Sequence, residues 1–334
     1  MRNVVYKSMI VSTSEVLNQL RKIYTRQGYH FAGIQSCVKP CHWMKKSLTT
    51  GGKSFCYKQL WYSIPSHRCL QMTPTILCNL QCIYCWRAHE ADLGLRPITE
   101  YQKVDFDEPE DIVVNTMIEW RKILSGFRGH PKVTHTMFEE AIRPVHVTLS
   151  LTGEPMIYPR VSELIEEYFK YGFKSVFVVT NGTFPERMYE LSKEPSQFYV
   201  TLPAPNEDVF KTVCRPLIPN AWRKLMDTIE ALSTLNCPTV LRLTMVKGYN
   251  MIKPEEYAKI IDSGNPTYVE VKAAMDVGYF RRRLSKENMP RYVDIVDFAH
   301  AIVDNLGGYR IIGCYLPSRV VLISRLDKPI KIID

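Results

Sequence analysis

The chain has 334 residues, 46% of them hydrophobic, which is enough for one large α/β domain or two smaller ones. No apolar run is long enough to span a bilayer and the N-terminus lacks a signal-peptide layout, so we expect a cytoplasmic protein without membrane contacts. The net charge of +9, from 43 Lys and Arg against 34 Asp and Glu, is compatible with a nucleic acid partner, although many enzymes of small molecules are as basic.

In chain order, the apolar patterns predict a helix over residues 13–28, an irregular segment over 33–68 and then alternating strands and helices. The strands are apolar or β-branched runs, as in parallel sheets buried on both faces: residues 70–77, 144–151, 174–180, 197–202, 239–246 and 267–273. The helices cover residues 108–124, 159–171, 185–191, 220–235, 254–261 and 290–306, and two short strands follow at 309–314 and 319–324. This alternation predicts an α/β fold, a partial (β/α)6 TIM-like barrel with its chemistry at the C-terminal ends of the strands.

Cysteines are concentrated near the N-terminus. Seven of the ten lie between positions 37 and 85, and in an intracellular protein such a concentration indicates metal or redox chemistry rather than disulfides. We therefore interpret the irregular segment as one organised by metal.

Three of these cysteines, Cys78, Cys82 and Cys85, follow the first predicted strand at tight spacing. They can ligate three irons of a 4Fe–4S cubane that takes four cysteines when fully ligated, which leaves one iron open for a ligand such as S-adenosylmethionine (SAM). The form CxxxCxΦC, with Tyr84 before the last cysteine, is typical of radical SAM enzymes. The alternative is a zinc site completed by His89 or Cys69, but the position after the first strand of a βα series favours a radical SAM barrel.

Polar residues at the ends of the later strands are candidates for SAM binding. Gly153 permits close approach of the backbone to a ligand, and Glu154 offers an acceptor to the SAM ammonium group. Each candidate also has an ordinary explanation, since Asn-Gly turns and strand-end threonines are common, but together they fit one ligand lying across the barrel. The candidates are Ser150, Gly153, Glu154, Asn181, Thr201, Arg242 and Thr244, and the sixth strand adds Glu270 and Lys272.

Upstream, Cys41, Cys56 and Cys69 are widely spaced, unlike the CxxC pairs of zinc ribbons. They could hold a second cluster or remain free buried thiols, and Cys37 is a competing ligand. Lys58 follows Cys56 by two residues. Most lysines are simply solvated, but one beside a desolvated cluster could form a Schiff base with a carbonyl substrate.

The chain contains the segments VKPCHWMKKS, FCYKQLWYSIPSHRCLQMTP, CNLQCIYCWR, SLTGEP, VVTNG, LRLTMVKGYN and YVEVKAAMDVGY. Together, from about Gly28 to the C-terminal region, they resemble the archaeal wybutosine-synthesis radical SAM enzymes, the tRNA 4-demethylwyosine synthases. The resemblance implies an incomplete TIM barrel and a SAM-dependent carbon–carbon lyase. Such an enzyme condenses N1-methylguanosine, beside the anticodon of tRNA-Phe, with pyruvate.

The resemblance also implies two 4Fe–4S clusters with SAM as cofactors. Cys78, Cys82 and Cys85 match the SAM-cluster ligands, Cys41, Cys56 and Cys69 match the second-cluster ligands in preference to Cys37, and Lys58 matches a lysine implicated in a pyruvate Schiff base. The implied mechanism begins with hydrogen abstraction from the N-methyl group by a SAM-derived radical. The carbon radical then adds to pyruvate held by the second cluster, Lys58 or both, and the carboxylate is lost. A separate donor of flavodoxin or ferredoxin type supplies electrons.

We expect a monomer divided into an N-terminal helix and second-cluster segment (1–68), the radical SAM partial barrel (69–275) and a helix and strand extension (276–334). Phosphate contacts with tRNA require basic side chains, and the candidates are Lys45, Lys46, Arg87, Arg281, Arg282, Arg283 and Arg291. For the stretch after Tyr279 the alternative is a solvated loop. Two other functions stay open: a radical SAM enzyme acting on another RNA base or a metabolite, which would not need Lys58, and a non-catalytic, zinc-stapled RNA-binding protein.

Overall fold

Six parallel strands form the centre of the fold in the computed structural model, which describes residues 12–332. They pair in chain order, each parallel to the next: β3 (Cys69–Thr73), β4 (His146–Leu149), β5 (Ser175–Thr180), β6 (Gln197–Thr201), β7 (Thr239–Met245) and β8 (Tyr268–Ala273). Sequential parallel order with helices between the strands is the arrangement of a (β/α) barrel. The predicted partial barrel of six βα units is therefore confirmed.

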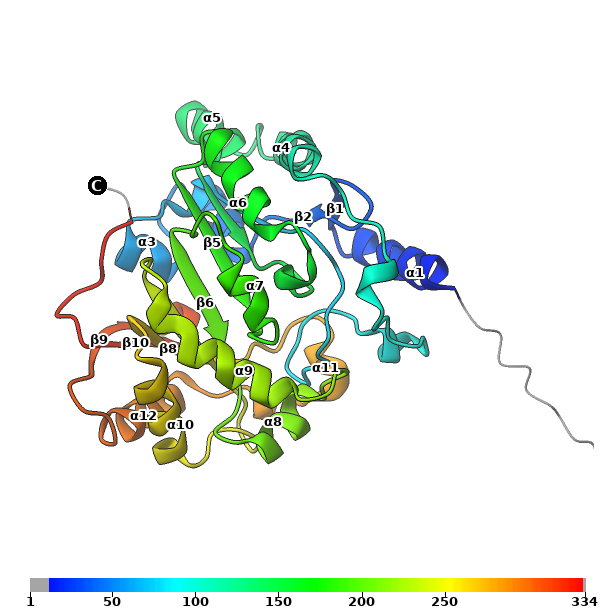
Figure 1. The fold of residues 1–334 in the computed structure, drawn as a ribbon. Helices are drawn as coiled ribbons and strands as arrows, with labels where there is room; N and C mark the ends of the chain where they lie inside the picture. The colour runs from blue at the N-terminus through cyan, green and yellow to red at the C-terminus, as the bar shows by residue number, and fades with distance from the viewer. Residues whose placement is uncertain (1–11, 333–334) are drawn as a thin grey trace, which may run out of the picture.

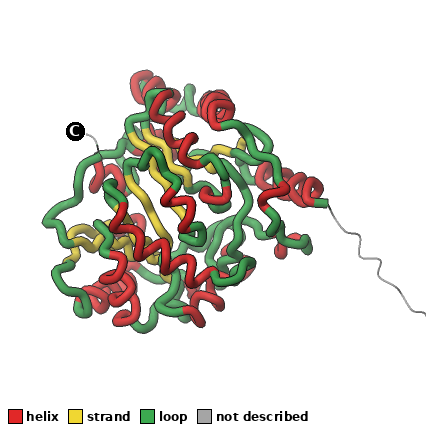
Figure 2. Tube along the Cα trace, in the orientation of Figure 1, coloured by secondary structure: helices red, strands yellow, loops and turns green. Residues whose placement is uncertain are grey.

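Helices surround the strands on the outside (Figure 2). They are α4 (Pro109–Ser125), α5 (His135–Ile142), α6 (Val161–Lys170), α7 (Pro185–Tyr189), α8 (Glu207–Cys214), α9 (Ala221–Glu230), α10 (Pro254–Gly264) and α12 (Tyr292–Val303). In Figure 1, α6, α7 and α9 lie in front of β5 and β6. Between these layers is the main core, in which Val176 and Val178 of β5 are fully buried. None of the helices in residues 12–332 is long and apolar enough to cross a membrane.

Antiparallel strands extend both ends of the parallel array. β1 (His30–Phe31) and β2 (Cys37–Val38) add to β3, while β10 (Val320–Ser324) pairs with β8 and β9 (Arg310–Tyr315) with β10. The two C-terminal strands match the predicted ones. The sequence did not predict β1 and β2, because two residues are too few to show an alternating pattern.

The N-terminal region begins with α1 (Thr13–Arg26), as predicted, but the prediction of an irregular segment over 33–68 is partly wrong. Two short helices, α2 (His42–Thr49) and α3 (Tyr57–Tyr62), form within it. The buried aromatic residues of α3 join a separate core with inward-facing strand residues such as Phe177, Tyr199 and Tyr268. The helix therefore packs against the concave side of the sheet, the inside of the partial barrel.

Candidate active site

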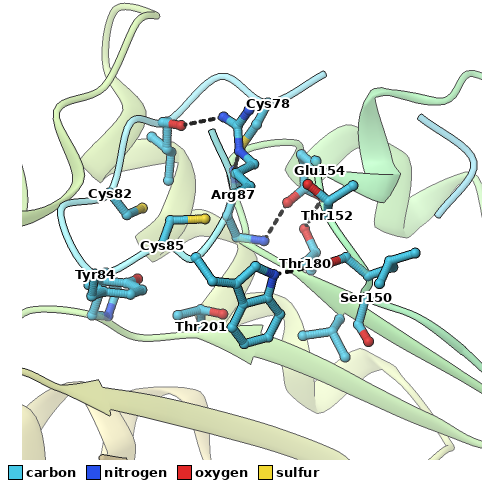
Figure 3. A pocket seen from close by; sticks show the side chains of 17 residues that line it. Cys78, Cys82, Tyr84, Cys85, Arg87, Ser150, Thr152, Glu154, Thr180 and Thr201 are labelled. Carbon is cyan, nitrogen blue, oxygen red and sulfur yellow. Dashed lines mark hydrogen bonds between the residues drawn. The ribbon is translucent and has the colours of Figure 1, made fainter. Parts of the chain in front are cut away.

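The loop after β3 presents three cysteines to one pocket. Cys78, Cys82 and Cys85 line it with Ser150, Gly153, Glu154, Asn181 and Thr201 from the C-terminal ends of β4, β5 and β6. Figure 3 shows the cysteine loop on one side and Ser150, Glu154 and Thr180 on the other. The structure thus brings together the predicted SAM-cluster ligands and five of the predicted SAM-binding residues.

Burial and hydrogen bonding affect the three thiols differently. Burial raises the pKa of Cys78 to about 12 and also raises that of Cys85, whereas a hydrogen bond with Cys214 lowers the pKa of Cys82. The positive charge of Arg87 lowers the pKa of all three cysteines. Thiolates bind iron, so a buried cation beside them stabilises the form that ligation needs.

Glu154 connects two of the strand ends. Its Oε1 accepts hydrogen bonds from the Thr180 hydroxyl (2.6 Å) and the Met156 amide (3.0 Å), and its Oε2 accepts one from the Asn181 amide (2.6 Å). Burial raises the pKa of Glu154 to about 7. A carboxylate oxygen accepts more than one bond, so Oε2 retains acceptor capacity for the ammonium group of SAM.

Gly153 positions Glu154 against the cysteine loop. Its φ of +68° is in the left-handed region, and an added Cβ would lie 2.3 Å from the Thr75 carbonyl oxygen and 2.7 Å from that of Leu77. The Glu154 amide donates to the same Leu77 oxygen (2.7 Å). Only glycine allows this contact between the loop after β4 and the residues that lead into Cys78.

Two of the predicted SAM-binding residues, Arg242 and Thr244 of β7, do not line the pocket. Arg242 instead donates from Nε to Glu270 Oε2 (2.9 Å) and from Nη2 to the Tyr57 hydroxyl (2.9 Å). Tyr57 donates in turn to Glu270 Oε2 (3.0 Å). The assignment of Arg242 and Thr244 to SAM is therefore not supported: paired to a buried carboxylate, Arg242 belongs to a charged network inside the barrel.

The second set of cysteines also comes together. Cys41 and Cys56 are the residues preceding α2 and α3, and Cys69 begins β3. Burial raises the pKa of all three thiols, to about 12 for Cys41 and about 11 for Cys56. The charges of Cys69 and Cys56 raise the pKa of Cys41 further, because the three side chains are neighbours. Cys37 lies apart from this set, in the separate core formed with α1.

No three His, Cys, Asp or Glu side chains within residues 12–332 lie close enough to hold a single metal ion. A cubane cluster is several ångströms wide, so its thiolates need not converge on one point. Two sets of three cysteines therefore match the chemistry of cluster ligands that each leave one iron open.

Lys58 extends from α3 into the barrel and is 8% exposed. Its Nζ lies 3.9 Å from the centre of the Phe177 ring and 4.7 Å from that of Tyr199. Burial, followed by the charge of Arg242, lowers the pKa of Lys58. A lowered pKa favours the neutral amine, the form that attacks a carbonyl carbon.

Two of the residues predicted to contact tRNA are buried. Arg87 is 1% exposed and donates to the Leu80 carbonyl (3.1 Å), and the Arg283 side chain, on α11 (Phe280–Arg283), is 7% exposed. Arg283 donates to the carbonyls of Cys85 and Arg87 (both 2.8 Å) and pairs with Asp92. The prediction that Arg87 and Arg283 contact phosphates is wrong, because both side chains hold the cysteine loop. The remaining candidates, Lys45, Lys46, Arg281, Arg282 and Arg291, are exposed.

Fold and pocket together define an enzyme of the radical SAM class. The Radical SAM superfamily model matches residues 72–261, and a model for wyosine base formation matches residues 263–325. An S-adenosyl-L-methionine-dependent tRNA 4-demethylwyosine synthase from Pyrococcus abyssi is 47% identical over 325 residues, which cover 96% of this chain and 93% of that protein. The chain belongs to the family of tRNA 4-demethylwyosine synthases.

More distant relatives and solved structures agree with this assignment. The synthase of Oryza sativa subsp. japonica is 35% identical over 92% of this chain, which covers 46% of the rice protein. A solved "Structure of TYW1 with a lysine-pyruvate adduct bound" superposes with a TM-score of 0.82 at 29% identity, and a "Crystal structure of archaeal TYW1" with 0.75 at 28%. Each match covers 94% of this chain and 98% of the other.

Proposed function

We propose that this chain synthesises 4-demethylwyosine, using SAM to condense N1-methylguanosine beside the anticodon of tRNA-Phe with pyruvate. One observation carries the proposal: the chain brings together two sets of three cysteines, and Lys58, two residues after Cys56 of one set, extends into the same barrel. Two Pyrococcus proteins that are named for this activity match this chain over 93% of their own length. A lysine–pyruvate adduct in a structure of the same fold points to the kind of chemistry that Lys58 would perform.

We infer that each cysteine set holds one 4Fe–4S cluster. When bound, the cluster at Cys78, Cys82 and Cys85 supplies the electron that cleaves SAM. Glu154 accepts the SAM ammonium group through Oε2, and the strand ends that line the pocket orient the cofactor. Reductive cleavage consumes one electron, so a separate flavodoxin or ferredoxin type protein has to provide it.

Lys58 prepares the second substrate. Its amine attacks the ketone carbon of pyruvate, a carbon–nitrogen double bond forms, and water leaves without any change of oxidation state. The surrounding rings of Phe177 and Tyr199 exclude water from the amine, which favours the condensed product. Exposed basic residues, namely Lys45, Lys46, Arg281, Arg282 and Arg291, supply phosphate contacts that hold tRNA.

Iron and labile sulfide in anaerobically reconstituted protein test this proposal directly. We expect about eight irons per chain, and about four after Cys78, Cys82 and Cys85 are all changed to Ala or after Cys41, Cys56 and Cys69 are. Lys58→Arg should keep both clusters but lose incorporation of labelled pyruvate carbons into N1-methylguanosine-containing tRNA. Zinc in place of iron, or four irons reduced to none by the first triple change alone, would contradict the proposed pair of clusters.

A further inference from the structure

Inside the barrel, positive side chains outnumber carboxylates. Besides the Lys58 amine, Arg242 and Lys272 are half-buried here, and each has Glu270 among the charged groups that act on it. Glu270 is fully buried, and a single oxygen, Oε2, accepts its two hydrogen bonds, from Tyr57 and Arg242 Nε, and forms the ion pair with Arg242 Nη2. One carboxylate compensates one of these cations, so this network leaves positive charge for an anion.

Arg242 also has a donor to spare. Its Nε and Nη2 are used by Glu270 and Tyr57, whereas Nη1 makes no hydrogen bond to any of residues 12–332 in the structure. The side chain is 18% exposed, so this end of the guanidinium is accessible. A guanidinium fixed by buried partners is a pre-organised donor for a carboxylate.

Arg242 and Lys58 lie against the same aromatic ring. The Arg242 Cζ atom is 4.6 Å from the centre of the Tyr199 ring, and Lys58 Nζ is 4.7 Å from it. Both cationic groups thus lie within 5 Å of one ring centre, and a keto acid bound to the lysine through its ketone carbon would have its carboxylate on the side chain's free end, near the arginine.

The strand register places Arg242 beside a residue that lines the SAM pocket. Arg242 of β7 is paired with Thr201 of β6 on one side and with Glu270 of β8 on the other. Thr201 lines the pocket that the SAM-cluster cysteines face. A keto acid held by Lys58 and Arg242 would thus lie between α3 and the place where the radical forms.

We propose that Arg242 binds the carboxylate of the α-keto acid that condenses with Lys58 and so selects an anionic substrate. This inference rests on the proposed role of Lys58. Glu270 and Tyr57 are positioning residues, because they fix the guanidinium without reaching the substrate.

Trapping the condensed lysine tests the proposal in the anaerobically reconstituted holoenzyme. Borohydride reduces the carbon–nitrogen double bond, and mass spectrometry measures the fraction of Lys58 modified at increasing concentrations of pyruvate or pyruvamide. Pyruvamide is a neutral molecule of the same shape. Arg242 is changed in the Glu270→Gln background, since Arg242→Gln alone would leave a buried, unpaired carboxylate.

Wild type and Glu270→Gln should reach half-modification at a pyruvate concentration about tenfold or more below that for pyruvamide. That factor is expected for a hydrogen bond between charged groups. The double variant Arg242→Gln/Glu270→Gln should modify Lys58 equally with both compounds, and Arg242→Lys should retain the preference for the anion. An equal preference for pyruvate in the double variant and in Glu270→Gln would overturn the role of Arg242. If wild type forms no adduct with either compound, the role of Lys58 fails, and this proposal fails with it.

Discussion

Replacing Gly153 by Ala should disrupt the SAM pocket through the backbone alone. The left-handed φ of +68° costs a residue with a Cβ about 1–2 kcal/mol. The new methyl group would also lie 2.3 and 2.7 Å from two backbone oxygens, of Thr75 and Leu77. Backbone atoms cannot rotate away as a side chain can, and overpacking of this kind costs about 1–3 kcal/mol more. We expect Gly153→Ala to lower the free energy of unfolding by about 2–5 kcal/mol in total.

Gly28→Ala is the matched control. Gly28 has a φ of +80°, but no atom lies within 4 Å of the place where its Cβ would be. Gly28→Ala should lower the free energy of unfolding only by the cost of the left-handed φ, about 1–2 kcal/mol. Urea denaturation of the cofactor-free proteins measures both losses, and iron analysis should show fewer irons in Gly153→Ala only. Equal losses in the two variants, with equal iron content, would refute the argument that contact with residues 75–77 shapes the pocket.

Three further changes test other parts of the site. Arg283→Ala removes the ion-pair partner of Asp92, so it should lower the free energy of unfolding by about 3–5 kcal/mol and reduce iron loading. The neighbouring change Arg282→Ala is the control and should alter stability by less than about 0.5 kcal/mol. Changing Arg281 and Arg282 to Ala should lower the slope of log affinity for tRNA against log salt by about 1 per arginine. Burial raises the pKa of Glu154 from 4.5 to about 7, so the folded state favours the protonated side chain. The free energy of unfolding should therefore be highest below pH 4.5 and decrease by about 3 kcal/mol as the pH rises to 7. Glu154→Gln should remove that decrease.

Each of these three predictions has an outcome that contradicts it. Equal stability of Arg283→Ala and Arg282→Ala would mean that the buried ion pair does not hold the cysteine loop. An unchanged salt slope would remove α11 from the tRNA interface. Parallel pH profiles of urea-induced unfolding for wild type and Glu154→Gln would show that Glu154 ionises in the folded chain as it does in the unfolded one.

The sequence predicted the parallel strands well because strands buried on both faces are continuous apolar runs, as in the stretch around Val176 and Val178. It did not predict α3, since six residues are too few to show helical periodicity. Nor does a sequence show where a long side chain points. Arg87 and Arg283 resemble surface cations in the sequence, but each is buried against the carbonyls and thiols of the cysteine loop.

The same limit applies to Arg242. A buried charge is costly unless it is paired, so an arginine in an apolar strand was singled out in the sequence as a candidate for ligand binding. The sequence could not show that Arg242 lies outside the lining of the SAM pocket and bonds to Tyr57, because Tyr57 belongs to a distant segment that only the folded chain brings near.

The contact of Arg283 with the cysteine loop limits how this enzyme could have evolved or be re-engineered. Arg283 lies in the segment matched by the wyosine model, and the carbonyls and Asp92 that it binds lie in the segment matched by the Radical SAM superfamily model. The two segments are therefore not interchangeable modules. Exchanging the C-terminal segment for one that recognises another substrate would remove a support of the SAM-cluster loop, unless the new segment provides a cation at the same place.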